Sequence, residues 1–274
     1  MKAAPPFSFG MALIPKAAAS DWPLVEALLG LTLRSVRAQT DGDWRVLIAG
    51  HDKPRMADDP RVEFTSVDWP VEPPGPHNRD CDRKQRLLKD VALARGGGLF
   101  MLLDADDWVD CGLVAAARAA VGPDHVGALV ETGFMVDVGA GRAAPVPDPH
   151  WFAGAFHRLC GSSVIAHLRP DHPDPVRRDP FTVMWSHHQW PEVADAQGLG
   201  LARLSTPGAY IVNTSQNHSE RHGPHVDWRK GLSARVGREG FALDGAFAAR
   251  FGLDLETVGA VAERFLGRAK PAAE

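Results

Sequence analysis

Three carboxylates, Asp104, Asp106 and Asp107, directly follow an apolar run at residues 99–103. The run is continuous rather than alternating, which is typical of a strand buried on both faces of a sheet. Because the chain turns at the end of a strand, Asp104 and Asp106 can face one small volume, where like charges raise the pKa of both carboxyls. A hard divalent cation, Mg²⁺ or Mn²⁺, prefers oxygen ligands and removes that cost. The segment therefore predicts a site for one divalent cation on Asp104 and Asp106.

Helix capping is the alternative role for these carboxylates. Aspartate is a favoured N-cap residue, so one of the three is expected to cap the helix that follows. A lone D-x-D motif often occurs by chance. Its place here, after a buried strand in an alternating α/β pattern, favours the metal site.

The segment MWSHHQWPE, residues 184–192, holds candidates for a general base. An imidazole with a pKa of about 6.5 can take a proton from a hydroxyl at neutral pH. His188 is the first candidate and Glu192 the second, with His187 beside them. A polar helix start at the surface is the alternative for the histidine pair. Trp185 and Trp190 flank it and could form a platform for a sugar ring, although for each a place in the core is the better interpretation.

A second group of histidines, His218, His222 and His225, lies in the polar segment 213–225. Their spacing has no matching cysteine and fits no recognisable metalloprotease helix, which argues against a zinc site. We favour a polar surface loop.

Arg83 and Lys84 begin a predicted helix. They could reach a phosphate there, or they could form a charged, solvated turn, and we give the two interpretations equal weight.

The elements that must position these residues alternate between strand and helix through the first half of the chain. Asp21 is expected to cap a helix that has Pro23 in its first turn. Patterns of apolar residues predict strands at 7–15, 44–50, 62–68, 99–104 and 125–138, and helices after Asp21, at 82–95 and at 111–121. This order predicts a mostly parallel sheet flanked by helices, with ligands bound beyond the carboxyl ends of the strands, where Asp104 lies.

Composition narrows the class of protein. A chain of 274 residues with 45% hydrophobic and 23% charged residues is typical of a globular protein. Nucleic-acid-binding proteins usually carry an excess of basic residues. The net charge of this chain is −4, so no nucleic-acid partner is expected. Three cysteines without a CxxC pair indicate a reducing compartment. Without a signal peptide or an apolar stretch of about 20 residues, we expect a cytoplasmic protein with no transmembrane segment.

The layout of residues 7–140 resembles GT-A glycosyltransferases, in particular the family 2-like group. A first strand that ends in Ile14-Pro15 and a later strand that ends in D-A-D-D are shared features. The helix between them carries a segment similar to the T-x-x-S-V-x-x-Q-T pattern of that group, here Thr32, Ser35, Val36, Gln39 and Thr40.

The resemblance implies a Rossmann-like GT-A fold and a nucleotide-sugar donor. It implies that the segment after Pro15 lines the nucleobase pocket and that Asp52 binds the base or ribose. Asp104 would face the nucleotide sugar, Asp106 would ligate Mn²⁺ or Mg²⁺ under the diphosphate, and His218 would complete the metal site. Arg83 and Lys84 are candidates for the diphosphate.

Two features depart from the family pattern. His51-Asp52-Lys53 stands where the family often has D-D-x-S, which puts the role of Asp52 in doubt. The E-D pair that usually supplies the catalytic base is missing, and His187 and His188 lie in that part of the chain.

We therefore expect a metal-dependent glycosyltransferase that moves a sugar to an acceptor hydroxyl, with inversion as the family implies. The expected organisation is a catalytic domain at 1–227, with a donor and metal half at 7–140 and a less regular acceptor half at 141–227. A helical tail follows at 228–274, packed on the body or on a partner, which leaves room for a homodimer, and the tip from residue 267 should fray.

The acceptor can be a saccharide, a lipid-linked molecule or a protein. A nucleotidyltransferase is one alternative, although the segment after the first strand is not a glycine-rich phosphate loop. An inactive GT-A-like binding protein is another.

Overall fold

The structure is a computed structural model that describes residues 5–266. A seven-stranded sheet forms its centre, in the order β10-β6-β9-β4-β1-β2-β3. Its strands are β1 (Phe7–Ala12), β2 (Trp44–Gly50), β3 (Val62–Ser66), β4 (Gly98–Leu102), β6 (His125–Val130), β9 (Val164–Leu168) and β10 (Gly200–Leu204). Neighbouring strands are parallel except on both sides of β9. The sheet confirms the predicted α/β class, with a mostly parallel central sheet flanked by helices.

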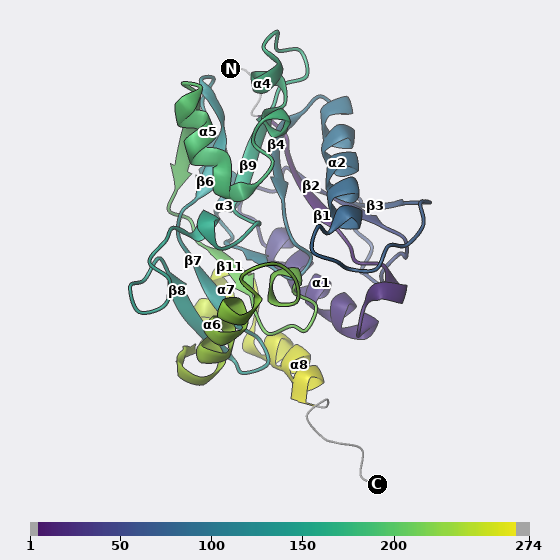
Figure 1. The fold of residues 1–274 in the computed structure, drawn as a ribbon, viewed down its shortest axis with the longest axis vertical. Coiled ribbons are helices and arrows are strands. Elements are labelled where there is room, and N and C mark those ends of the chain that lie inside the picture. Colours follow the sequence, from purple (N-terminus) through teal and green to yellow (C-terminus); the bar gives the residue numbers. More distant parts are fainter. Residues whose placement is uncertain (1–4, 267–274) are drawn as a thin grey trace.

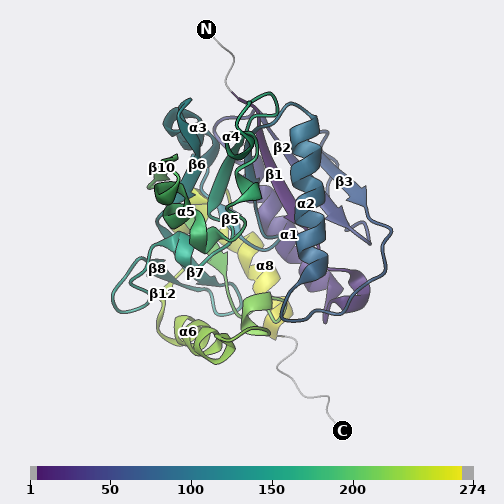
Figure 2. The same cartoon turned by 45° about the horizontal axis from the view of Figure 1, so that its top comes forward.

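Helices cover both faces of this sheet (Figures 1 and 2). Alternate β1 residues, Phe7, Phe9 and Met11, share a buried cluster with α1 (Trp22–Arg37). On the other face, α2 (Arg79–Ala94) packs in a cluster with β2 and β4. The shorter helices are α3 (Leu113–Ala120), α4 (Pro175–Arg178) and α5 (Trp190–Ala196). Successive side chains of β1 point to opposite faces of the sheet, so this one strand packs against helices on both faces.

The start of α1 forms as the sequence predicts. The Asp21 carboxylate accepts a hydrogen bond from the Leu24 amide at 2.9 Å, and Pro23 lies in the first turn. This cap fixes where α1 begins. The chain reaches it from β1 through a short 3-10 turn, η1 (Lys16–Ala18).

A second, five-stranded sheet was not predicted. Its order is β12-β8-β7-β11-β5. The strands are β5 (Trp108–Val109), β7 (Gly133–Asp137), β8 (Arg142–Val146), β11 (Gly208–Ile211) and β12 (Phe241–Ala242). The single strand predicted at 125–138 is thus two strands, β6 and β7, which pair in different sheets. Both halves are apolar, and only Glu131 and Thr132 mark the break.

The C-terminal helices pack on the second sheet and on α1. They are α6 (Val226–Glu239), α7 (Gly245–Arg250) and α8 (Leu255–Leu266). Phe251 and Val258 share a buried cluster with α1 residues and with Trp108 of β5. The domain division expected at 227/228 would fall inside α6 and stays a prediction. The predicted fraying tip lies outside the described residues.

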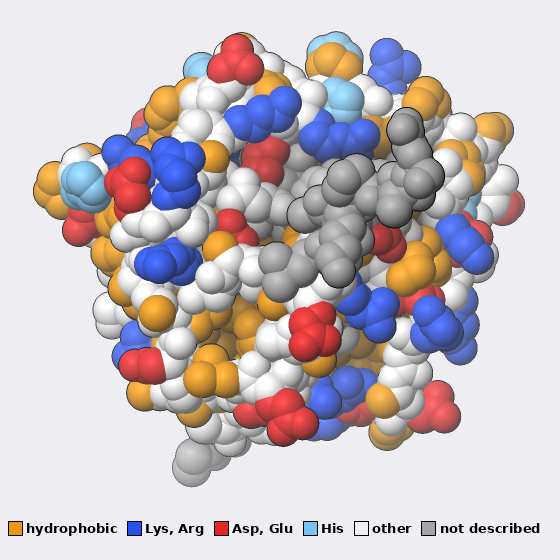
Figure 3. Space-filling model, turned by 90° about the horizontal axis from the view of Figure 1, so that it is seen from below, with side chains coloured by type: hydrophobic (Ala, Val, Ile, Leu, Met, Phe, Trp, Pro, Cys, Tyr) orange, Lys and Arg blue, Asp and Glu red, His pale blue; other side chains and the backbone are white. Residues whose placement is uncertain are grey.

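The surface carries mixed charges. Figure 3 shows basic and acidic side chains interspersed over the visible part of one face. No helix within residues 5–266 is both long and apolar enough to cross a membrane.

Asp107 joins the two sheets. Its side chain is buried at 1% exposure, one residue before β5. One carboxylate oxygen accepts from the Ile211 amide of β11 at 2.9 Å. The other accepts from the Ser162 hydroxyl at 2.6 Å and the Cys160 thiol at 3.2 Å, in the turn that leads to β9 of the central sheet. Asp107 is therefore the structural member of the acidic cluster, although it does not cap a helix.

Replacement of Asp107 by alanine should destabilise the fold. Three buried donors would lose their acceptor, so we expect the free energy of unfolding to fall by about 3 kcal/mol in urea titrations. Asp107→Asn keeps one carbonyl oxygen and should cost less. The control is Asp58→Ala, at an exposed carboxylate. Equal stability of Asp107→Ala and the control would show that the contact contributes little.

Candidate functional site

A cavity of about 710 Å³ opens at the carboxyl ends of β1 and β4. The chain runs from β1 to β2 and β3 on one side, and then returns through α2 to β4 on the other side of β1. The strand order therefore reverses between β1 and β4, which is where open α/β sheets bind ligands. Residues 12–15 at the end of β1, and Leu102 with residues 104–106 at the end of β4, line the cavity.

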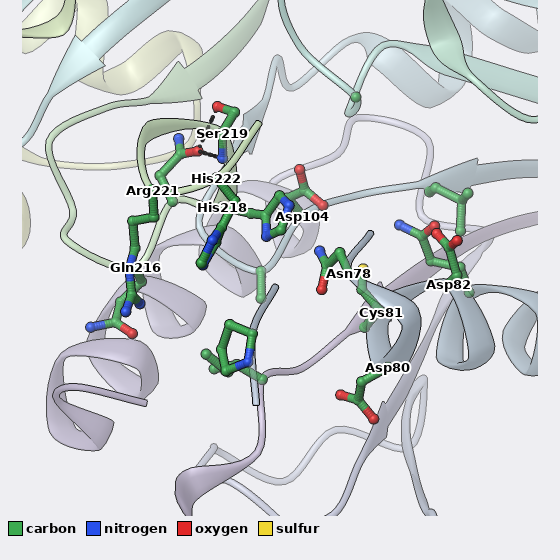
Figure 4. Close-up of a pocket in the computed structure, with 18 of the residues that line it drawn as sticks. Asn78, Asp80, Cys81, Asp82, Asp104, Gln216, His218, Ser219, Arg221 and His222 are labelled. Carbon is green, nitrogen blue, oxygen red and sulfur yellow. Dashed lines mark hydrogen bonds between the residues drawn. The ribbon is translucent and has the colours of Figure 1, made fainter. Parts of the chain in front are cut away.

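Two segments far apart in sequence face each other across this cavity (Figure 4). One is the start of α2 with the proline-rich loop before it, residues 72–82. The other is residues 216–222, which include the 3-10 turn η5 (His218–Glu220). Asp104 lies between them in the view of Figure 4. The polar loop expected at 213–225 is thus part of the cavity wall.

Asp104 and Asp106 both line the cavity. The Asp104 amide donates to the Ser162 hydroxyl at 2.9 Å, the same hydroxyl that donates to Asp107, so the buried Asp107 network holds the backbone of Asp104. Within residues 5–266, no other residue donates a hydrogen bond to the side chain of Asp104 or Asp106. Both side chains are free to receive a ligand.

Burial raises the pKa of Asp106 well above its ordinary value, and the charges of Asp107 and Asp104 add to the effect. Burial also raises the pKa of Asp104. Asp104 meets solvent in the open cavity, so water moderates its shift more than that of Asp106. Two carboxyls that resist ionisation, with no donor to stabilise them, suit a divalent cation.

The protein alone offers an incomplete set of metal ligands. Among residues 5–266, no three His, Cys, Asp or Glu side chains come together as a group that could hold a metal ion. The proposed third ligand, His218, lines the cavity, but its ring is bonded to the Pro76 backbone and lies 5.0 Å from the ring of His222. A cation on Asp104 and Asp106 would need further oxygens from water or a substrate, which is the usual arrangement for Mg²⁺.

Three residues expected to bind the donor lie outside the lining. Lys84 is fully buried, and its ammonium donates to the Leu13 carbonyl at 2.8 Å and to Asp80 at 2.5 Å. Arg83 stacks on Trp69, with its guanidinium carbon 4.3 Å from the ring centroid. Asp52 accepts from the Lys16 amide at 2.8 Å and so fixes the turn after Pro15, which does line the cavity. Lys84 and Asp52 thus hold the end of β1 in place.

The structure separates the candidates for the base. His187 lines the cavity in the 3-10 turn η4 (His187–Gln189), and its Nδ1 is bonded to the His157 carbonyl. His188 is exposed and stacks on His187, with ring centroids 3.8 Å apart. Glu192 is exposed and forms an ion pair with Arg158. Of the three, His187 alone is among the described lining residues.

His187 also lies near Asp104, on the other side of Gly161. A Cβ placed on Gly161 would stand 3.7 Å from an Asp104 carboxylate oxygen and 3.9 Å from the His187 ring. Because Gly161 has no side chain, nothing from that position separates the two. Burial, with the neighbouring His188 next, lowers the pKa of His187 to about 4. The imidazole is therefore neutral at physiological pH.

The sequence interpretation missed several lining residues. Tyr210, Arg221 and Arg229 all line the cavity. None lies in a motif, and only the pairing of β11 in the second sheet brings Tyr210 there. Of the two tryptophans, Trp190 is fully buried, which confirms a core place for it, and Trp185 is half-buried with the Arg86 guanidinium 4.1 Å from its ring.

The fold has a distant likeness to a solved structure. No protein-family profile matches the sequence, and no curated protein matches it. Among solved structures, the fold is similar to that of S. aureus TarS, a glycosyltransferase, with a TM-score of 0.40 and 11% identity. The match covers 84% of this chain but 42% of TarS, so the chain spans less than half of that protein. A likeness so distant carries no conclusion about activity, and function has to be argued from the cavity.

Neutralising Asp106 should stabilise the metal-free protein. Its pKa is higher in the folded chain than in the unfolded chain, so the ionised carboxylate destabilises the fold, and this penalty grows as the pH rises through the raised pKa. Asp106→Asn should therefore raise the Tm at neutral pH in EDTA, by on the order of 1 kcal/mol or about 2–4 °C, with a smaller gain at acidic pH.

Differential scanning calorimetry against Asp58→Asn, an exposed control, measures this difference. Excess Mn²⁺ should raise the Tm of the wild type and leave that of Asp106→Asn unchanged. A lower Tm for Asp106→Asn in EDTA would mean that the carboxylate supports the fold instead.

Proposed function

We propose that this chain transfers a sugar from a nucleoside diphosphate donor to an acceptor hydroxyl, with the help of a divalent cation. One observation carries the proposal: Asp104 and Asp106 end a central strand at the point where the strand order reverses, inside a cavity of about 710 Å³. A cavity of this size suits a ligand as large as a nucleotide sugar.

The donor would lie across the carboxyl ends of β1 and β4. The nucleoside would contact the backbone at Leu13–Pro15, which Lys84 and Asp52 hold from outside the cavity. Mn²⁺ or Mg²⁺ on Asp104 and Asp106 would neutralise charge on the leaving diphosphate. Arg79 and Arg221 line the cavity, one on each facing segment, and could reach the phosphates from either side.

His187 is the residue that the geometry favours as general base. A carbonyl oxygen only accepts hydrogen bonds, so the bond to His157 requires a proton on Nδ1 and leaves the Nε2 lone pair free. As the acceptor oxygen attacks the anomeric carbon, its proton would move to Nε2. The bond from that carbon to the diphosphate would break, and its electron pair would leave with the diphosphate oxygen.

The donor site can be tested by isothermal titration of UDP, GDP and their common sugar conjugates, with Mn²⁺ and with EDTA. We expect one base to bind in Mn²⁺ and its affinity to fall at least about tenfold in EDTA and in Asp106→Ala. Asp58→Ala is the control and should bind as the wild type does. If no nucleotide binds in Mn²⁺, the glycosyltransferase proposal is wrong.

The base can be tested by turnover of the donor that binds. His187→Gln should lower kcat by about 10²-fold or more while donor affinity stays unchanged, and His188→Gln should have a much smaller effect. Because only the neutral imidazole can accept a proton, kcat at saturating donor and Mn²⁺ should fall as the pH drops through about 4. A larger loss of kcat in His188→Gln, or a fall in kcat near the ordinary imidazole pKa of about 6.5, would show that His187 is not the base.

Tight nucleotide binding without turnover of any kind would indicate a binding protein.

A further inference from the structure

Arg229 is a half-buried cation that lines the cavity without a carboxylate partner. Its Nη1 donates to the Leu159 carbonyl at 2.9 Å and to the Tyr210 hydroxyl at 3.4 Å, and both acceptors are uncharged. No ion pair joins Arg229 to any Asp or Glu of residues 5–266. Arg158, whose charge also acts on His188, is already paired with Glu192.

Part of the guanidinium remains open to a ligand. Within the described chain, neither Nε nor Nη2 of Arg229 donates to a protein acceptor. These two atoms form the planar fork that matches both oxygens of a carboxylate or a phosphate. The charge of Arg229 acts on the buried Glu220, whose pKa is raised by burial, but within the described chain the two form no ion pair. A partly desolvated cation without a directly paired carboxylate is costly, and an anionic ligand would relieve that cost.

The position of Arg229 assigns it to the acceptor side. Arg229 and His187 line the same cavity, and the charge of Arg229 contributes to the lowered pKa of His187 and His188, after burial in each case. It is bonded to Leu159, two residues before Gly161. Among the hydrogen bonds and ion pairs of the described residues, none joins Arg229 to Asp104 or Asp106, where the donor diphosphate would lie.

Two aromatic rings lie near the Arg229 guanidinium. Trp228, next to Arg229 in α6, has 48% of its surface exposed, and the Arg229 guanidinium carbon lies 5.7 Å from its ring centroid. Phe152 packs against Trp228 with centroids 5.9 Å apart, and the Tyr210 ring lies 5.9 Å from the same guanidinium carbon. An exposed indole is a surface on which the apolar face of a sugar ring can pack.

We infer that Arg229 binds an anionic group of the acceptor, so that the acceptor is a sugar that carries a phosphate or a carboxylate. This inference rests on the proposed function, because it takes His187 as the site of the acceptor hydroxyl. Arg229 holds the anion with Nε and Nη2, Trp228 supports the ring, and the hydroxyl is directed toward His187.

The test titrates three probes that share one ring: glucose, glucose 6-phosphate and glucuronate. Each is measured calorimetrically with the full chain, in Mn²⁺ with the nucleoside diphosphate that binds, and also with neither. At least one acidic probe should bind about tenfold or more tightly than glucose. Its phosphate or carboxylate identifies the anion. Arg229→Gln should remove the preference, and Arg229→Lys should retain part of it. The control is Arg238→Gln, an exposed site on the same helix, which should bind all probes as the wild type does.

Two results would overturn the inference. Either the wild type does not distinguish glucose from its acidic derivatives, or Arg229→Gln weakens nucleotide binding instead, which would place Arg229 at the donor diphosphate. Thermal unfolding of Arg229→Lys checks that the fold is intact. Because the probes are also titrated without nucleotide, failure of the donor site leaves the anion preference measurable, and the two proposals can fail separately.

Discussion

The buried carboxylate of Asp107 is the constraint on which this site depends. It accepts hydrogen bonds from β11 of the second sheet and from the turn before β9 of the central sheet. The Ser162 hydroxyl that it orients also accepts from the Asp104 amide. These hydrogen bonds fix the position of the chain after β4. Asp104 and Asp106 are therefore held toward the cavity, although the repulsion between their charges opposes this arrangement. The fixed backbone keeps the two carboxylates in place for a cation, even though they repel each other when no cation is bound.

A second buried network does the same for the opposite wall. Lys84 fills the space between α2 and β1, where its ammonium donates to the Leu13 carbonyl and to Asp80. Asp80 in turn accepts from the Trp69 indole at 2.9 Å. An ion pair in this place is weak support for stability, since both charges lose their water. Its role is to set the distance between the end of β1 and the start of α2, and with it the width of the cavity.

The sequence was sufficient for strands β1, β2, β3, β4 and β6 of the central sheet and for the place of Asp104 and Asp106 after β4, because both follow from local patterns, but it did not predict β9 or β10. An apolar run followed by Asp104 and Asp106 specifies a strand end with carboxylates. It was insufficient where tertiary pairing decides. The break between β6 and β7 has no turn signal, and a charged helix residue such as Lys84 gives no sign that it is buried. Arg229 lies in no motif, and its lack of a partner is a property of three-dimensional packing alone.

In the proposed function, Asp104 and Asp106 hold a divalent cation beneath a nucleoside diphosphate. Crystals grown with Mn²⁺ and the nucleotide that binds, measured at the manganese absorption edge, test it most directly. We expect one anomalous peak within coordination distance of Asp104 or Asp106 and of the diphosphate oxygens. A diphosphate bound elsewhere, or bound in this cavity with manganese at neither carboxylate, would contradict it.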